Sequence, residues 1–243
     1  MFPIRDVNPR RHHPPVVTIA LIAANALLFF YEISLGERLE GFLMSSAFIP
    51  ERLFDGGVIT PDEWIPGAKS ALLSMFLHGG WLHFLGNMLF LWVFGDNVED
   101  RLGHLKYLVF YLLAGYAATF AHAFAGPQSA VPAIGASGAI AGILGAYLFL
   151  HPMARIVTVV WIVFIIRVVH IPAIVYLPIW FLMQAFSGYA AIAAATPEDA
   201  GGVAWFAHIG GFIAGPLLLL VLGGFRRPRE RRPPERRPAS PWS

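Results

Sequence analysis

The feature that most constrains this chain is its long stretches without a charged side chain. No Asp, Glu, Lys or Arg occurs between Lys106 and Arg155. Only 13% of the residues are charged, 57% are hydrophobic, and the mean hydropathy is +0.63, whereas a soluble domain carries about 25% charged residues. The chain therefore predicts an all-α polytopic membrane protein. The absence of cysteine excludes disulfides, thiolate metal sites and a cysteine nucleophile.

Six apolar segments are candidates for helices that cross a hydrocarbon layer of about 30 Å. The first follows Arg10 and Arg11 and resembles the core of a signal peptide, but no cleavage motif follows it, so we interpret it as a retained helix. Residues 156–166 are apolar but too short to span, and we interpret them as an interfacial or re-entrant piece, with the path of residues 153–170 left open. The predicted membrane domain, 16–224, contains helices at about 16–31, 81–98, 107–125, 137–150, 171–189 and 203–224.

An even number of spans places both termini on one side of the membrane, and the charges agree with that arrangement. The segment 1–15 is basic, and the tail 225–243 holds seven arginines against two glutamates, whereas loops 32–70 and 190–202 are acidic. Because basic segments stay on the cytoplasmic side, we expect both termini in the cytoplasm, in a membrane of the bacterial inner (plasma) type. Proline and like charge predict a disordered tail, which we interpret as a contact for anionic lipid rather than for nucleic acid.

Four polar side chains lie in the first turns of three predicted helices. His83 and Asn87 are four residues apart on the second, Ser137 opens the fourth, and His208 is near the start of the sixth. These helices run in the same direction, so the four groups share one depth, toward the outer face. Polar groups inside a bilayer are costly and indicate function.

Small residues predict that the fourth and sixth helices approach closely. Each carries a glycine pair spaced by four residues, which lets two helix backbones pack together. Each pair begins within three residues after the polar residue of its helix, so we expect Ser137 and His208 to come within hydrogen-bonding distance. The helix-packing glycines are Gly135, Gly138, Gly142, Gly211 and Gly215.

The chemistry available to such a cluster is acyl transfer. A serine hydroxyl needs a base to become a nucleophile, and His208 is the candidate base for Ser137. The backbone N–H of Ser137, the Asn87 amide and the His83 ring are candidate donors to the oxyanion. No Asp or Glu lies at these helix ends, so we expect a dyad. Taken singly, the serine is typical of a helix cap and the other groups of helix–helix contacts, but their shared depth favours a catalytic site.

The chain resembles the rhomboid family of intramembrane serine proteases over residues 10–225. The matching strings are HGGWLHFLGNMLFLWVFGDNVEDRLG (78–103), GASGAIAGILGAYL (135–148) and AHIGGFIAG (207–215). The resemblance implies a six-transmembrane-helix rhomboid fold with a water-filled cavity open to the outer side. It implies Ser137 as nucleophile, His208 as general base, and His83 and Asn87 as oxyanion-binding groups. It also implies that the substrates are transmembrane helices cut near the outer face, without a metal or organic cofactor.

The sequence departs from the family in two places. Some members carry an aromatic residue one turn after the serine, stacked on the histidine, but Ala141 stands there in this chain, so another group must orient His208. The Trp-Arg pair that some members have in the first outer loop is missing from 32–70. The alternative function is a non-proteolytic rhomboid-like protein that binds or escorts membrane clients. A transporter is disfavoured because the polar groups lie at one level and no paired repeats occur.

Overall fold

The computed structural model describes residues 2–8, 14–55, 58–59, 61–162, 165–193 and 205–224. The predicted tail 225–243, most of the loop 190–202 and the predicted start of the last helix at residue 203 lie outside these ranges. The helices are α1 (Val16–Ser34), α2 (Leu39–Ser46), α3 (Pro61–Ser74), α4 (Trp81–Leu102), α5 (His104–Ala125), α6 (Ser137–Leu150), α7 (Ala173–Ala193) and α8 (Trp205–Val221), with short 3-10 turns at Gly36–Arg38 and Pro50–Leu53. The strands are β1 (Phe2–Val7), β2 (Phe54–Asp55), β3 (Val58–Ile59), β4 (Arg155–Ile162) and β5 (Ile165–Pro172).

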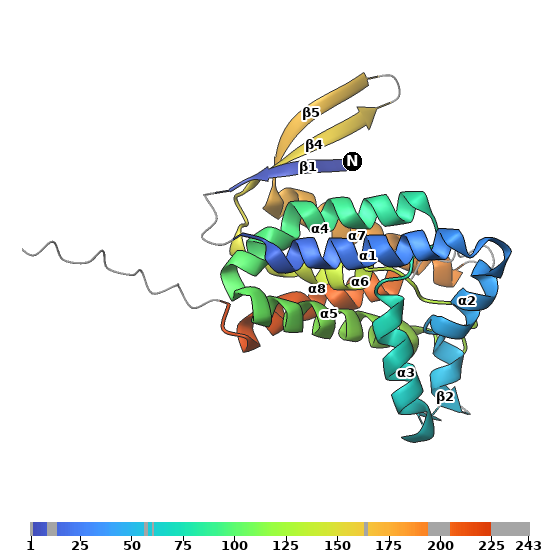
Figure 1. The fold of residues 1–243 in the computed structure, drawn as a ribbon. Helices are drawn as coiled ribbons and strands as arrows, with labels where there is room; N and C mark the ends of the chain where they lie inside the picture. Colours follow the sequence, from blue (N-terminus) through green and yellow to red (C-terminus); the bar gives the residue numbers. More distant parts are fainter. Residues whose placement is uncertain are drawn as a thin grey trace, which may run out of the picture.

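The structure is mostly helical, as a helical membrane protein requires (Figure 1). Among the described helices, α1 and α5 are long and apolar enough to cross a membrane by themselves. Apolar but shorter segments occur at Ser137–Leu150, Ala173–Phe186 and Trp205–Val221. The number of spans, six, therefore stays a prediction.

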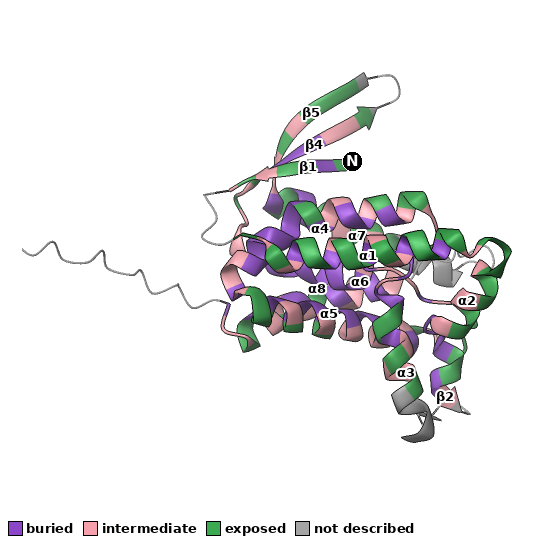
Figure 2. Ribbon diagram, viewed as in Figure 1, coloured by how far each residue is buried: buried purple, intermediate pink, exposed green. Residues whose placement is uncertain are grey.

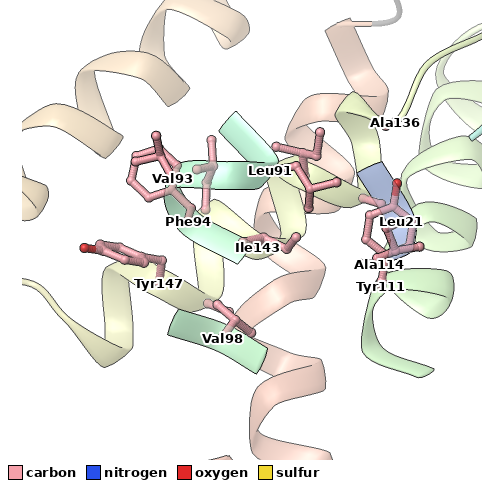
Figure 3. Close-up of a cluster of buried hydrophobic side chains, with 14 of the residues drawn as sticks. Leu21, Leu91, Val93, Phe94, Val98, Tyr111, Ala114, Ala136, Ile143 and Tyr147 are labelled. Atoms are coloured by element: carbon pink, nitrogen blue, oxygen red, sulfur yellow. The ribbon is translucent and has the colours of Figure 1, made fainter. Parts of the chain in front are cut away.

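Helix α6 lies at the centre of the bundle. Its residues from Gly138 to Tyr147 are all buried, and it packs against α4, α5 and α8. Figure 2 shows this buried centre beside the exposed outer face of α1. Figure 3 shows part of the core, with Tyr111 of α5, Phe94 of α4 and Tyr147 of α6. A helix made of glycine, alanine and a few large apolar residues suits this position, because its small side chains let three neighbours approach.

A carboxylate from a neighbouring helix caps the start of α1. No side chain caps this helix locally, since Pro15 occupies the cap position. Instead, the buried carboxylate of Glu99 in α4 accepts hydrogen bonds from the backbone N–H groups of Val17 and Thr18, each at 2.8 Å, and from the Thr18 hydroxyl at 2.7 Å. Anions stabilise helix N-termini because they meet unpaired N–H groups and the positive end of the helix dipole. This contact ties α1 to α4.

Residues 155–162 and 165–172 form two antiparallel strands, β4 and β5. Strand β4 pairs antiparallel with β5 on one side and with the N-terminal strand β1 on the other, in the order β1-β4-β5. The sheet leaves the bundle at the end where α1 begins (Figure 1). The predicted helix 171–189 therefore starts later, at Ala173, because residues 171 and 172 complete β5. The segment 156–166, interpreted above as an interfacial or re-entrant piece, contributes most of β4 and the start of β5, and its β-branched residues suit strands.

Candidate active site

Ser137 and His208 are in contact. The Oγ atom of Ser137 lies 2.7 Å from Nε2 of His208, and the histidine is 9% exposed. The helix cap is Ala136, and no side chain bonds the first turn of α6. Ser137 is thus the first residue inside the helix, and its hydroxyl faces the imidazole instead of acting as a cap.

Glycine contacts between α6 and α8 produce this approach. A Cβ atom added at Gly211 would lie 2.1 Å from the carbonyl oxygen of Gly138, and one added at Gly215 would lie 2.0 Å from that of Gly142. Both distances are far below any real Cβ contact. The helices therefore pack backbone to backbone, and only glycine permits this at these positions. The predicted glycine faces meet each other directly after the two polar residues, because Gly138 and Gly142 follow Ser137 by one and five residues, and Gly211 and Gly215 follow His208 by three and seven.

The loop before Ser137 is held by the segment that follows α2 and by the end of α3. The N–H of Gly135 donates to the carbonyl oxygen of Ser74 at 2.8 Å, and the N–H of Ala133 donates to the carbonyl oxygen of Phe48 at 2.8 Å. The Ser74 hydroxyl in turn accepts from the N–H of Phe48 at 2.7 Å. The segment that joins α2 to α3 and the end of α3 therefore hold the loop that presents the serine.

His83 and Asn87 lie against the same loop. Gly135 has φ +121°, and a Cβ atom there would lie 2.6 Å from Nε2 of His83 and 3.5 Å from Nδ2 of Asn87. A side chain at this position would be strained by its backbone conformation and would also collide with the imidazole. Gly135 thus lets both polar groups of α4 reach the start of α6.

Both groups are arranged as donors. The buried Nδ2 atom of Asn87 has no hydrogen-bond partner among the described residues. The N–H of Gly79 points at Nδ1 of His83 at 3.4 Å. This contact favours the tautomer with hydrogen on Nε2, the nitrogen that faces Gly135. A buried, unpaired amide costs stability, and such a group beside a nucleophile is suited to bind an oxyanion.

The opposite side of the His208 ring contacts α7. Its Nδ1 atom lies 2.6 Å from Oε1 of Gln184. The ring of Trp180 is 5.9 Å away between centroids, and Trp205 presents an edge at 6.1 Å. The sequence reasoning missed Gln184. The sequence signal that could have identified it is that Gln184 is the only amide side chain in the apolar run 171–189.

These residues share one cavity of about 850 Å³. Its polar lining comes from four helices, α4, α6, α7 and α8, and its walls are otherwise apolar. The site residues that line it are His83, Asn87, Ser137, Trp180, Gln184 and His208. The cavity lies at the end of the bundle opposite the three-stranded sheet, because Ser137 opens the helix whose far end leads into β4.

The buried side chain of Glu32, on α1, contacts the backbone of His78. Both oxygens of Glu32 accept the backbone N–H of His78, at 3.1 and 3.2 Å, and the His78 ring packs edge-on against His83 at 5.3 Å. Burial, and to a smaller extent the neighbouring His83, lower the pKa of His78 from 6.5 to about 4. His78 is therefore neutral at pH 7 and packs as an aromatic ring. Sequence reasoning also missed the role of Glu32.

A metal centre has no support in the described part of the chain. No group of three or more His, Asp or Glu side chains there lies close enough to hold an ion. The site residues are instead a hydroxyl, imidazoles and amides, a set suited to proton transfer and hydrogen bonding.

Comparison with known proteins places this arrangement in a family. The family model described as "Rhomboid domain" matches residues 68–225, more than half of the chain. The chain belongs to the rhomboid family. The matched region includes all of the predicted site residues and Gln184.

Individual relatives come from several kinds of organism. The chain is 34% identical to RHOMBOID-like protein 5 of Arabidopsis thaliana over 34% of its length and 27% of the relative. It is 33% identical to rhomboid protease GluP of Bacillus subtilis over 56% of its length and 24% of the relative. It is 30% identical to the mitochondrial presenilin-associated rhomboid-like protein of Bos taurus, over 59% and 35%. The matches thus span about a quarter to a third of these relatives, which include plant, bacterial and mitochondrial proteins.

Proposed function

We propose that this rhomboid protein is an intramembrane serine endopeptidase that hydrolyses peptide bonds in or next to transmembrane helices of membrane-protein substrates. The observation that carries the proposal is the 2.7 Å contact between Ser137 Oγ and His208 Nε2 on the wall of a cavity. A protease among the relatives supports it.

The chemistry follows from the positions of these atoms. Ser137 donates its proton to Nε2 of His208 as its oxygen attacks the carbonyl carbon of the substrate. His208 then gives this proton to the leaving amine, so that the C–N bond breaks and an acyl-enzyme forms. Water, activated by the same imidazole, releases the acyl group and regenerates the hydroxyl. In each half-reaction, the imidazole of His208 therefore takes up one proton and then gives it away.

The tetrahedral oxyanion is bound by donors around the start of α6. The N–H of Ser137 has no acceptor within its helix, because the first N–H groups of a helix are unpaired. The free amide of Asn87 and Nε2–H of His83 approach from α4. The positive end of the α6 dipole favours the same charge. No metal or organic cofactor enters this reaction.

The proposed substrates and orientation follow from where the site lies. The cavity is mostly apolar and opens near one end of the bundle, so we propose that it receives a locally unwound segment of a transmembrane helix near the outer face of the membrane. Exposed apolar residues of α7, such as Leu182 and Phe186, face lipid in this arrangement. The start of α1 and the end of α8 lie at the other end (Figure 1), which we assign to the cytoplasmic side. The partners are substrate helices and the lipid bilayer.

The test uses the full chain purified in detergent and returned to lipid vesicles. Wild-type protein is expected to react with a fluorophosphonate probe and to cut single-span substrates, with cut sites read by mass spectrometry. Ser137→Ala and His208→Ala are expected to lose cleavage by about 10⁴-fold or more while keeping their melting temperatures. Ser45→Ala and His170→Ala, at exposed positions away from the cavity, are the matched controls. Cleavage by purified Ser137→Ala, or a wild type that binds client helices without cutting them, would contradict the proposal in favour of the escort alternative.

A further inference from the structure

We propose that Gln184 is a positioning residue that holds the imidazole of His208 in the tautomer able to accept the proton of Ser137. This inference rests on the proposed function, since it concerns the same proton transfer. It adds a third helix, α7, to the pair that carries the nucleophile and the base.

The geometry shows a continuous line of polar contacts through the imidazole. Oε1 of Gln184 lies 2.6 Å from Nδ1 of His208, and Nε2 of the same ring lies 2.7 Å from Oγ of Ser137. Each nitrogen of the ring therefore has one partner, on opposite sides. The three side chains come from α7, α8 and α6, and all of them line the cavity.

The chemistry of an amide oxygen determines the proton position. Oε1 only accepts hydrogen bonds, so Nδ1 must carry the hydrogen in this contact. A neutral imidazole has one N–H, and Nε2 is then left with a lone pair directed at the serine hydroxyl. In the other tautomer, Nε2–H would point at Ser137, and Nδ1 would place a lone pair against the lone pairs of Oε1. The amide therefore favours the productive tautomer, as the orienting group of a hydrolytic triad does.

A neutral acceptor suits this environment. His208 is 9% exposed, and a carboxylate in the same place would bring a second charge out of water at a high cost. The other titratable side chains near the ring, among the described residues, are His83 on α4 and His122 on α5. Neither carries a negative charge, so Gln184 supplies the hydrogen-bond acceptor on the Nδ1 side.

The bond between Gln184 and His208 also shows how the imidazole can be oriented although alanine, and not an aromatic residue, stands one turn after the serine. Ala141 is fully buried and has no ring to stack on the histidine. The Gln184 bond fixes the rotation of the imidazole, and the rings of Trp180 and Trp205 limit its tilt. Orientation is thus supplied by α7 and α8 and not by α6.

The experiment compares two substitutions of nearly equal size in the full-length protein. Gln184→Met keeps the length of the side chain but removes the acceptor oxygen. We expect its kcat for a single-span substrate to fall about ten- to a hundredfold, the range that losing an orienting partner costs a metal-bound histidine, with KM unchanged. Gln184→Glu keeps an oxygen that can accept from Nδ1, and we expect it to restore most of the kcat lost in the methionine variant. The rate of fluorophosphonate labelling should follow the same order.

Met183→Ala is the matched control, because this neighbour on α7 is exposed and lies outside the cavity lining. It is expected to keep the wild-type kcat. The inference is overturned if Gln184→Met retains wild-type kcat, if it changes KM alone, or if Gln184→Glu falls as far as Gln184→Met. A wild type that neither labels nor cleaves would instead refute the proposed function, so the two failures are distinguishable.

Discussion

Gly215→Ala adds one methyl group at the contact between Gly215 and Gly142, and we expect it to separate Ser137 from His208. The new Cβ would lie 2.0 Å from the carbonyl oxygen of Gly142, and this atom belongs to the backbone of a buried helix and cannot rotate away. The two helices must therefore move apart.

The size of this movement follows from the contact distance. Real Cβ atoms essentially never approach closer than 3.0 Å, so α8 must shift by about 1 Å from α6 to reach even a tight contact. His208 lies two turns before Gly215 on the same helix. A shift of this size lengthens the contact between His208 Nε2 and Ser137 Oγ from 2.7 Å to roughly 3.7 Å, which is beyond a hydrogen bond. A misplacement of about 1 Å costs about a hundredfold in rate, and this is the loss in kcat that we expect.

Two assays follow the effect. Cleavage of a single-span substrate in vesicles gives kcat, and the rate of fluorophosphonate labelling reports the nucleophile without any substrate helix. Gly41→Ala makes the same chemical change in α2, where the new Cβ would meet no atom within 4 Å. Ile213→Ala changes an exposed side chain on α8 itself. Both controls are expected to keep wild-type rates.

The reasoning fails if Gly215→Ala labels and cleaves at the wild-type rate while remaining folded. It also fails if Gly41→Ala slows the reaction equally, because helix propensity and not helix separation would then be the cause.

Two further predictions concern stability, each measured by thermal unfolding in detergent. Glu99→Ala leaves the N–H groups of Val17 and Thr18 without an acceptor and should lower the free energy of unfolding by about 3 kcal/mol. Glu40→Ala, at an exposed position, should change it little. Equal effects of the two substitutions would contradict the capping role of Glu99. Because burial lowers the pKa of His78 from 6.5 to about 4, the unfolded chain binds the proton of this residue first as the solution is acidified. The stability that His78 itself contributes is therefore present above about pH 6.5 and should be lost as the pH falls toward 4. His78→Phe should show a smaller loss over this interval, and an unchanged loss would show that other groups cause it.

The sequence was sufficient to predict that Ser137 and His208 come into contact. Glycine pairs beside Ser137 and His208 are local patterns, and a helix converts such a pattern directly into a face. The direction of each helix then fixes the depth of its polar groups. Two short segments of sequence therefore predicted a contact between residues that are far apart in the chain.

The sheet could not be predicted in the same way. A short, continuous apolar run such as 156–166 is compatible with a buried strand and with a short buried helix, so its periodicity does not distinguish the two. What decides the outcome is pairing with β1, whose residues such as Arg5 and Asp6 form no obvious strand pattern. The register that joins Asp6 to Ile156 depends on contacts that only the folded chain contains.

The third partner of the proton transfer was missed for a different reason. Gln184 lies in a helix without a glycine motif or a recognised sequence string, and a lone glutamine in an apolar helix is usually a link between helices. Its depth was available from the direction of α7. The face on which it lies was not, because an apolar helix with Pro178 inside it offers no pattern that shows which side packs on the bundle. Only the packing of α7 on α8 turns the amide toward the histidine.

The pairing of β1 with β4 has a consequence for how the protein is made. Residues 2–7 are synthesised long before their partners at 155–159, which appear only after the four long helices α1, α4, α5 and α6. At about 5 to 20 residues per second, the ribosome needs roughly 8 to 30 seconds to reach them. Asp6 waits nearly as long for Tyr147, whereas its other partner, Asn97, is made earlier. Strand β1 therefore finds its partner strand only after α6 has been made, although β5, α7 and α8 are still to follow.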